Sequence, residues 1–381
     1  MKRTPLYEFH AKNGNLVEFA GYGMPVWYSS ITEEHLAVRN HSGIFDVSHM
    51  GRMVVSGPNA TQFIEKLVPT LAASQPPGKS FYTLLLNSDA GIIDDVIIIK
   101  RERDYLLVVN AANKAKDVEY MKALSGSMGV EVADISDDTT MIAIQGPEAV
   151  RALQPLSAVN LRDVKRFTHV KSKVGEGVAT ITRTGYTGED GFEVILYGSG
   201  VENNSVATSV WSDLATRATP CGIGARDSLR IEAGLPLYGS DIDESTNPFE
   251  AELSWVLSKG KTGYVGADAI ARLRESPPRR VRRGIMVADR IPRRGFGIMD
   301  TSGRRIGEVT SGTFSPLLRR GIAIGYIDTP DSQVGGTVRV DVRGSLAEGR
   351  VVKTPFYDDT VYGWKRIKSK NNSPPRPRLT S

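Results

Sequence analysis

Apolar and polar positions recur with two different periods along this chain. Residues 59–67 carry apolar side chains at every third or fourth position, which predicts a helix. Residues 81–86 and 92–99 are nearly continuous apolar runs on either side of a polar turn at 87–91, which predicts two paired strands. Both periods recur throughout the chain, so a mixed α and β protein is expected.

The same criteria predict further elements in the first 240 residues. Helices are expected over residues 30–38, 111–124, 206–214 and 225–233, the first opened by a Ser-Ile-Thr-Glu capping box. Strands are expected over residues 52–55, 105–109, 141–144, 180–183 and 192–196.

A break in composition separates the last third of the chain. Residues 276–280 read Ser-Pro-Pro-Arg-Arg, a stiff and charged linker. Beyond it, short strands are expected over residues 284–287, 307–310, 322–327, 337–342 and 349–353. Short strands at this spacing predict a small barrel or sandwich. A length of 381 residues fits two or three domains.

The charge distribution argues against a nucleic-acid partner. The net charge is +5, but the segment from Lys365 onward carries six basic residues and no acid, so the rest of the chain stands at −1. This tail, rich in Pro and Ser, is expected to be disordered, either as a solubilising segment or as a contact for an acidic partner.

The single Cys221 excludes an intrachain disulfide and fits a reducing compartment.

Common motifs fail. Residues 259–262 echo a phosphate-binding loop, but Trp255 stands where a glycine is required. A dinucleotide fingerprint beginning at Gly222 meets Asp227 at its third glycine position. The five histidines show no metal-ligand spacing, so no metal is expected.

The chain has no apolar run of membrane-spanning length and no signal segment, so a cytoplasmic protein is expected.

Four segments carry more chemistry than folding requires. They are residues 45–51 (Phe-Asp-Val-Ser-His-Met-Gly), the pair Asp94-Asp95 at the start of an apolar strand, the Gly-rich loop 183–193, and residues 222–234. Each also has a purely structural interpretation, as a strand and turn, turn chemistry, a hairpin, or a charged helix. Tyr186 can stack on a flat ring, and Glu193 can accept two hydrogen bonds from an amidine-like edge.

Taken in order, these segments resemble the T-protein of the glycine cleavage system. The resemblance runs from about Thr4 to Tyr357 and is carried by Phe19-Ala20-Gly21, residues 45–51, residues 109–113, Gln145-Gly146-Pro147, residues 183–193, residues 224–227, Leu237-Tyr238-Gly239, residues 310–313 and residues 352–357. It implies an α+β fold with three domains around a central folate channel. Two interleaved α+β domains would comprise roughly 1–50 with 140–245 and 51–139 with 246–275. A C-terminal β-barrel (283–357) and the basic tail (358–381) would follow.

The resemblance also implies the reaction and its participants. A lipoylated H-protein would present an aminomethyl group, and tetrahydrofolate would accept its one-carbon unit without a metal; neither nucleic acid nor membrane would take part. Asp95 would be the catalytic carboxylate. The substrate and folate site would comprise Met50, Tyr82, Asn110, Tyr186, Glu193, Arg226, Trp255 and Arg294. The alignment leaves open whether Arg293 or Arg294 reaches the ligand.

Other functions remain open from the sequence, and the chain departs from the family's pattern at some positions. Another folate-dependent demethylase would share the fold and pteridine site, and a non-catalytic folate-binding relative would carry Lys-Gly-Cys-Tyr where this chain has Lys261-Thr262-Gly263-Tyr264. A plain interaction module would not need both Asp95 and the Glu193 loop. Tyr22 stands where the family often has Trp, and Ala90 replaces the first of two glycines.

Overall fold

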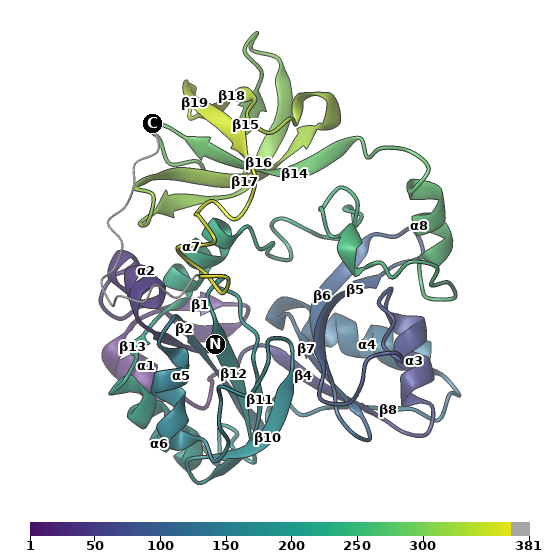
Figure 1. Ribbon diagram of the computed structural model, residues 1–381, viewed down its shortest axis with the longest axis vertical. Helices are drawn as coiled ribbons and strands as arrows, with labels where there is room; N and C mark the ends of the chain where they lie inside the picture. Colours follow the sequence, from purple (N-terminus) through teal and green to yellow (C-terminus); the bar gives the residue numbers. More distant parts are fainter. Residues whose placement is uncertain (367–381) are drawn as a thin grey trace.

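The computed structural model describes residues 1–366 and contains two open sheets and one closed barrel, besides a two-stranded hairpin. Figure 1 shows the barrel at one end of the molecule and the two open sheets side by side at the other, with helix α7 (Ile223–Ala233) near their meeting point. A mixed α and β fold with a C-terminal barrel confirms the predicted fold class.

The first open sheet has six strands in the order β10-β11-β12-β9-β3-β13. Their bounds are His169–Val174, Gly177–Thr182, Gly191–Tyr197, Thr139–Gln145, Gly43–Asp46 and Thr219–Pro220. The two stretches of chain that supply these strands, residues 1–46 and 139–233, also contain five helices: α1 (Tyr7–Asn13), α2 (Ile31–Asn40), α5 (Ala149–Leu153), α6 (Ser205–Ala215) and α7. Apolar side chains of α6, among them the buried Trp211, pack in one core with Phe192 of β12.

The second open sheet has five strands in the order β5-β6-β7-β4-β8. Their bounds are Ser80–Leu86, Ile92–Lys100, Tyr105–Val109, Gly51–Ser56 and Glu131–Asp134. Helix α3 (Ala60–Leu67) and helix α4 (Lys114–Ser125) share its main core. The predicted helical face of α3 is confirmed, because Phe63, Ile64 and Leu67 are buried. Helix α8 (Ala267–Leu273) packs in a further core with β5 and β6.

The barrel closes in the order β14-β17-β16-β15-β18-β19. Its strands are Arg280–Val287, Arg320–Asp328, Arg305–Ser315, Gly297–Met299, Thr337–Val342 and Ser345–Val352. Closure leaves no exposed edge for further pairing. Short 3-10 turns η1 to η4 span Ala111–Asn113, Gln154–Leu156, Ser254–Val256 and Thr329–Asp331.

Several elements differ from expectation. The hairpin of β1 (Asn15–Phe19) and β2 (Tyr22–Trp27) was not predicted, because its strands carry little apolar alternation. Residues 358–366, placed in the predicted tail, make defined contacts instead: Arg366 Nη2 donates to Glu189 Oε2 at 2.9 Å. Residues 367–381, the remainder of that tail, lie outside the described residues. The exact domain boundaries stay a prediction.

The turn before β6 places a non-glycine residue in a backbone conformation that favours glycine. Ala90 adopts a φ of +66°, in the left-handed region that L side chains rarely occupy. The next residue, Gly91, has no room for a side chain, since a Cβ would lie 2.0 Å from the Glu244 carbonyl oxygen. Ala90 therefore retains the turn at some backbone strain.

A buried ion-pair cluster joins the first sheet's helices to the barrel and to the C-terminal segment. It comprises His35, Arg39, Glu189 and Glu232, all at most 2% exposed. Arg39 Nε donates to Glu232 Oε2 at 3.0 Å, and Arg39 Nη1 donates to Glu189 Oε1 at 3.1 Å. The Ser315 hydroxyl of β16 also donates to Glu232. Every charge in this cluster therefore has a partner of opposite sign.

None of the helices within residues 1–366 is long and apolar enough to cross a membrane.

Candidate active site

One large cavity lies where the two open sheets, the barrel and the C-terminal segment meet. Its volume is about 780 Å³, which suits a ligand of cofactor size. Its walls include Tyr82 and Asp95 of the second sheet, Glu193 of the first, Arg282 of the barrel and Tyr357 beyond the barrel. No single part of the chain forms this cavity alone.

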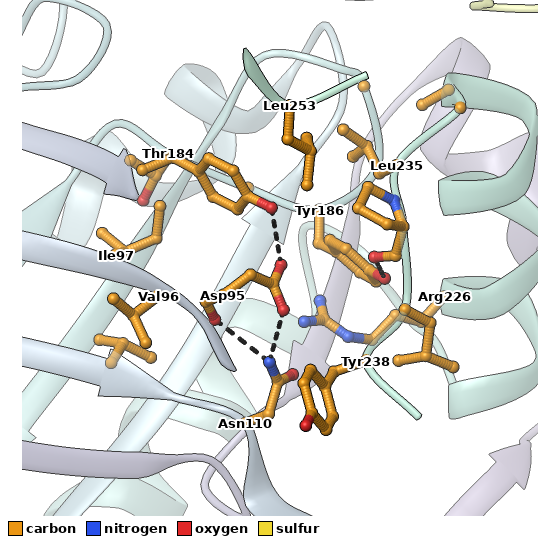
Figure 2. A pocket seen from close by; sticks show the side chains of 18 of the residues that line it. Asp95, Val96, Ile97, Asn110, Thr184, Tyr186, Arg226, Leu235, Tyr238 and Leu253 are labelled. Atoms are coloured by element: carbon orange, nitrogen blue, oxygen red, sulfur yellow. Dashed lines mark hydrogen bonds between the residues drawn. The ribbon is translucent and has the colours of Figure 1, made fainter. Parts of the chain in front are cut away.

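Asp95 lies on β6 with its carboxylate at the cavity wall (Figure 2). The Tyr82 hydroxyl donates to its Oδ2 at 3.0 Å, and Asn110 Nδ2 donates to its Oδ1 at 2.8 Å. Burial, followed by the negative charge of Asp94, raises the pKa of Asp95 to about 7. A carboxyl group with such a pKa can accept or release a proton near neutral pH.

Asp94, the preceding residue, lies on the other side of Asn110 and is fully buried. Asn110 donates to it twice, from its backbone N–H at 3.0 Å to Oδ2 and from Nδ2 at 2.8 Å to Oδ1. The same amide group of Asn110 therefore holds both carboxylates. The adjacent acids occupy different environments, as the alternation of side chains along a strand predicts.

The facing wall combines one aromatic ring, one cation and one carboxylate. The Arg226 guanidinium lies over the Tyr186 ring, 4.7 Å from its centroid. The Tyr186 hydroxyl donates to the Pro236 carbonyl, which fixes the plane of the ring. The Thr184 hydroxyl donates to Glu193 Oε2. These contacts hold the three side chains against the cavity in fixed orientations.

Two of these polar groups retain unused hydrogen-bonding capacity toward the cavity. Arg226 is half-buried, and its buried Nη1 atom has no hydrogen-bond partner among residues 1–366. Burial lowers the pKa of Arg226, with Glu193 acting in the opposite direction. Burial likewise raises the pKa of Glu193, opposed by the Thr184 hydroxyl and by Arg226. A polar ligand that hydrogen-bonds to both groups would satisfy them.

The sequence also predicts Met50, Tyr82, Trp255 and Arg294 as site residues. Met50 lines the cavity. Tyr82 and Trp255 stack with ring centroids 5.5 Å apart, and Trp255 is 66% exposed, so its outer face is open to solvent. Arg294 is not among the lining residues; its Nη1 lies 3.4 Å from the hydroxyl of Ser240, which does line the cavity. Arg293 instead donates to the Gly312 carbonyl at 3.1 Å.

Sequence reasoning missed part of the wall. Arg166 lines the cavity and lies 4.4 Å from the ring of Trp364, which also lines it. Neither residue lies in a motif, and Trp364 lies in a segment expected to be disordered. Tyr238 also lines the cavity, and the Leu237-Tyr238-Gly239 motif could have indicated it.

No group of three or more His, Cys, Asp or Glu side chains that could hold a metal ion occurs among the described residues.

Comparison with known proteins bears directly on this site. The family model described as the GCVT N-terminal domain matches residues 6–261, and the one described as the glycine cleavage T-protein C-terminal barrel domain matches residues 280–358. The chain belongs to the glycine cleavage T-protein family. The resemblance stated from the motifs is thereby confirmed, and the second match coincides with the observed barrel.

Individual relatives agree with this assignment. Aminomethyltransferases of Thermotoga maritima and Geobacillus kaustophilus are each 42% identical over 369 residues, covering 95% and 94% of this chain and 99% of the relative. The crystal structure of glycine cleavage system aminomethyltransferase T from Bartonella henselae superposes with a TM-score of 0.87 at 35% identity, covering 93% of this chain and 98% of that one. The chain is an aminomethyltransferase, a tetrahydrofolate-dependent transferase.

Proposed function

We propose that this enzyme transfers the one-carbon unit of an aminomethyl group from the lipoyl arm of H-protein to tetrahydrofolate. The observation that carries the proposal is Asp95, a carboxylate with a pKa near neutrality on the wall of a cavity shaped for a large ligand. In this reaction the carbon–sulfur and carbon–nitrogen bonds of the aminomethyl group break, and two carbon–nitrogen bonds to the folate form. The two folate N–H protons leave with ammonia and the lipoyl thiol, and the other product is 5,10-methylenetetrahydrofolate.

Asp95 is assigned to the proton transfer in this proposal. The attacking folate nitrogen must lose a proton while an iminium-like carbon develops positive charge nearby. An ionised carboxylate both accepts that proton and stabilises that charge. The hydrogen bonds from Tyr82 and Asn110 fix the orientation of the carboxylate before any substrate arrives. Preorganisation of this kind avoids reorganisation during the reaction.

Glu193, Tyr186 and Arg226 are assigned to the pteridine ring. A 2-amino-4-oxo pteridine presents adjacent donors that match the free acceptor capacity of Glu193, and its flat face can pack against an aromatic ring. Arg226 Nη1, which has no partner among residues 1–366, can donate to a carbonyl or other acceptor of the ligand. Asn110 completes the site beside Asp95. The fit between donors, acceptors and an aromatic wall supports folate as the ligand.

The other end of the site is assigned to the donor protein. Trp255 and Tyr82 form an exposed aromatic stack at the cavity. Such a stack suits an aliphatic lipoyl chain, which could lie against its outer face. Met50 adds apolar wall, and Arg294 at the rim can contact the folate tail or the H-protein. The proposal also holds that the enzyme is cytoplasmic, has no nucleic-acid or membrane partner and uses no metal.

Turnover with aminomethylated lipoyl H-protein and tetrahydrofolate tests the proposal, with methylenetetrahydrofolate and ammonia followed together. Formation of the two products in equal amounts is expected. Tetrahydrofolate binding without turnover would instead favour a different methyl donor. An H-protein whose lipoyl lysine is unmodified is the matched control, because it presents the same protein surface without the reacting group.

A further inference from the structure

Asp117, on the helix behind the Asp94–Asp95 strand, is a buried acid that the reaction outlined above does not use. It lies on α4 and is 0% exposed. Neither of its carboxyl oxygens receives a hydrogen bond from a donor group of residues 1–366. A buried carboxylate with no donor would be strongly destabilised. The side chain must therefore be neutral or have a function that compensates the cost.

Asp94 is the acceptor against which Asp117 packs. Burial raises the pKa of Asp117, followed by the negative charge of Asp94 and by a hydrogen-bond interaction between the two carboxyl groups. Asp94 already receives hydrogen bonds from Asn110 and from Asn113 Nδ2, the latter at 2.6 Å to Oδ1. Hydrogen bonds from donors favour the charged form of a carboxyl group, so Asp117, which receives none from residues 1–366, is the acid of this pair expected to keep its proton.

The charged groups around this pair agree with that assignment. From β6, Asp94 and Asp95 face Asp117, and both disfavour its ionisation. From its own helix, Lys116 acts in the opposite direction. The Lys116 ammonium is already engaged, since it donates to the Ile93 carbonyl at 2.9 Å and to the Tyr238 hydroxyl at 2.9 Å, and forms an ion pair with Glu244 at 3.1 Å. Lys116 therefore leaves Asp117 without a direct cationic partner.

We propose that Asp117 is a positioning residue for the transfer reaction: as a neutral acid it donates a hydrogen bond to Asp94, and the Asp94 carboxylate in turn holds Asn110 against Asp95. The chain of contacts runs from α4 to the cavity wall through one amide group, because Asn110 Nδ2 lies 2.8 Å from both Asp94 Oδ1 and Asp95 Oδ1 (Figure 2 shows the Asn110–Asp95 contact). The inference rests on the proposed role of Asp95.

The first test compares two substitutions of the same residue in turnover. Asp117→Asn keeps a neutral donor of the same shape, so kcat should stay within about threefold, and the acid limb of its pH profile should coincide with that of the wild type. Asp117→Leu removes the donor, and kcat should fall about tenfold while KM for tetrahydrofolate changes less than about twofold. Equal kcat values for the two variants would overturn the positioning role.

A shift of the acid limb of Asp117→Asn to lower pH would also overturn the proposal. That outcome would mean that Asp117 carries a negative charge in the wild type, since removing it would then make Asp95 easier to ionise. Asp117→Ala is the second donor-free variant, and it takes the place of Asp117→Leu should the latter fail to fold.

The second test needs no turnover. An acid that keeps its proton in the folded state but loses it on unfolding makes folding take up a proton, so stability falls as pH rises. Between about pH 6 and about pH 9, the Tm of the full-length wild type should fall relative to that of Asp117→Asn. Glu119→Gln, an exposed acid on the same helix, is the matched control and should follow the wild type.

Parallel Tm curves for wild type and Asp117→Asn would show that Asp117 is not a neutral acid and would refute the inference. A wild type without turnover, or an active Asp95→Asn variant, would instead refute the proposed function. The two failures are thus separable, because the Tm comparison reports the proton on Asp117 whatever the reaction is.

Discussion

The molecule buries two clusters of carboxyl groups whose electrostatics are opposite. In the ion-pair cluster of His35, Arg39, Glu189 and Glu232, burial acts to raise the pKa of Glu232, but His35 and Arg39 overcome it and lower that pKa to about 2. In the carboxyl cluster of Asp94, Asp95 and Asp117, burial and neighbouring negative charge act together, and the pKa of Asp95 rises to about 7. In the first cluster arginines pair directly with the acids, whereas in the second the groups that donate hydrogen bonds to the acids are amides and a hydroxyl.

This difference separates a structural role from the catalytic role proposed for Asp95. A buried acid that pairs with an arginine and accepts further hydrogen bonds stays ionised and holds elements together, as Glu232 does between α2, α7 and the barrel. A buried acid without a cation stays near its titration point and can exchange protons. The two clusters also depend on pH with opposite sign. The stability from Glu232 is present above its unfolded pKa of 4.5 and is lost as pH falls toward 2.

The largest effect is expected from breaking the ion-pair cluster. Arg39→Met leaves Glu232 and Glu189 buried without their shared cation, and should lower the free energy of unfolding by about 3–5 kcal/mol. Urea denaturation followed by circular dichroism measures this. Arg151→Met, which removes an exposed arginine paired with Glu148, is the control and should change stability by less than about 1 kcal/mol. Similar losses in both variants would contradict the structural role.

Asp95→Asn should produce the reverse combination, less activity and more stability. Turnover should fall at least about 100-fold, the scale of a lost acid–base group, while tetrahydrofolate still binds. The folded pKa is raised above the unfolded value of 3.8 to about 7, so the ionised side chain costs stability above that pH. The variant should therefore show a higher Tm than the wild type at about pH 8. Near-normal turnover would reject Asp95 as the base.

Glu193→Gln tests the facing wall, where the acid has one cation nearby but no direct ion pair. The substitution replaces an acceptor oxygen by a donor, which leaves pteridine donors unpaired. The Kd for tetrahydrofolate should rise about 10- to 100-fold, measured by calorimetry. The loss should be mainly in affinity, with kcat at saturating folate reduced less. Unchanged affinity would remove Glu193 from the pteridine site.

The smallest effect sharpens the comparison within the carboxyl cluster. Asp94→Asn removes the charge that, after burial, contributes most to raising the pKa of Asp95. The acid limb of kcat against pH should therefore move to lower pH by about one unit, with Asp95 still ionising. A limb that stays in place would show that burial alone sets the titration of Asp95.

Motif-bearing parts of the site were predictable from the sequence. Asp95, Asn110 and Glu193 lie within ordered motifs, and the structure brings all three to one cavity. The helical period of residues 59–67 likewise predicted α3, because its apolar face is regular. The local sequence pattern is enough to predict a site residue when the motif that contains the residue also forms the element that carries it.

Long-range partners could not be predicted. Arg39 and Glu232 are 193 residues apart and meet only because α2 packs on α7. Asp117 lies on a helix whose polar and apolar positions are poorly separated, so a buried acid there resembles an exposed one. Trp364 follows a short segment without a clear apolar period, and its backbone N–H donates to the Gly188 carbonyl at 3.0 Å. In each case the partner is supplied by tertiary packing.

The cavity is walled by both sheets, the barrel and the C-terminal segment, so on the proposed function its co-substrate is a structural component as well as a reactant. A tetrahydrofolate bound there, as proposed, would require these parts to be assembled, so at a concentration 100 times its Kd it would add about 2.7 kcal/mol to the stability of the whole chain. The supply of folate in the cell would then set both the rate of this enzyme and its lifetime against proteolysis. Folate starvation would deplete the protein along with its activity.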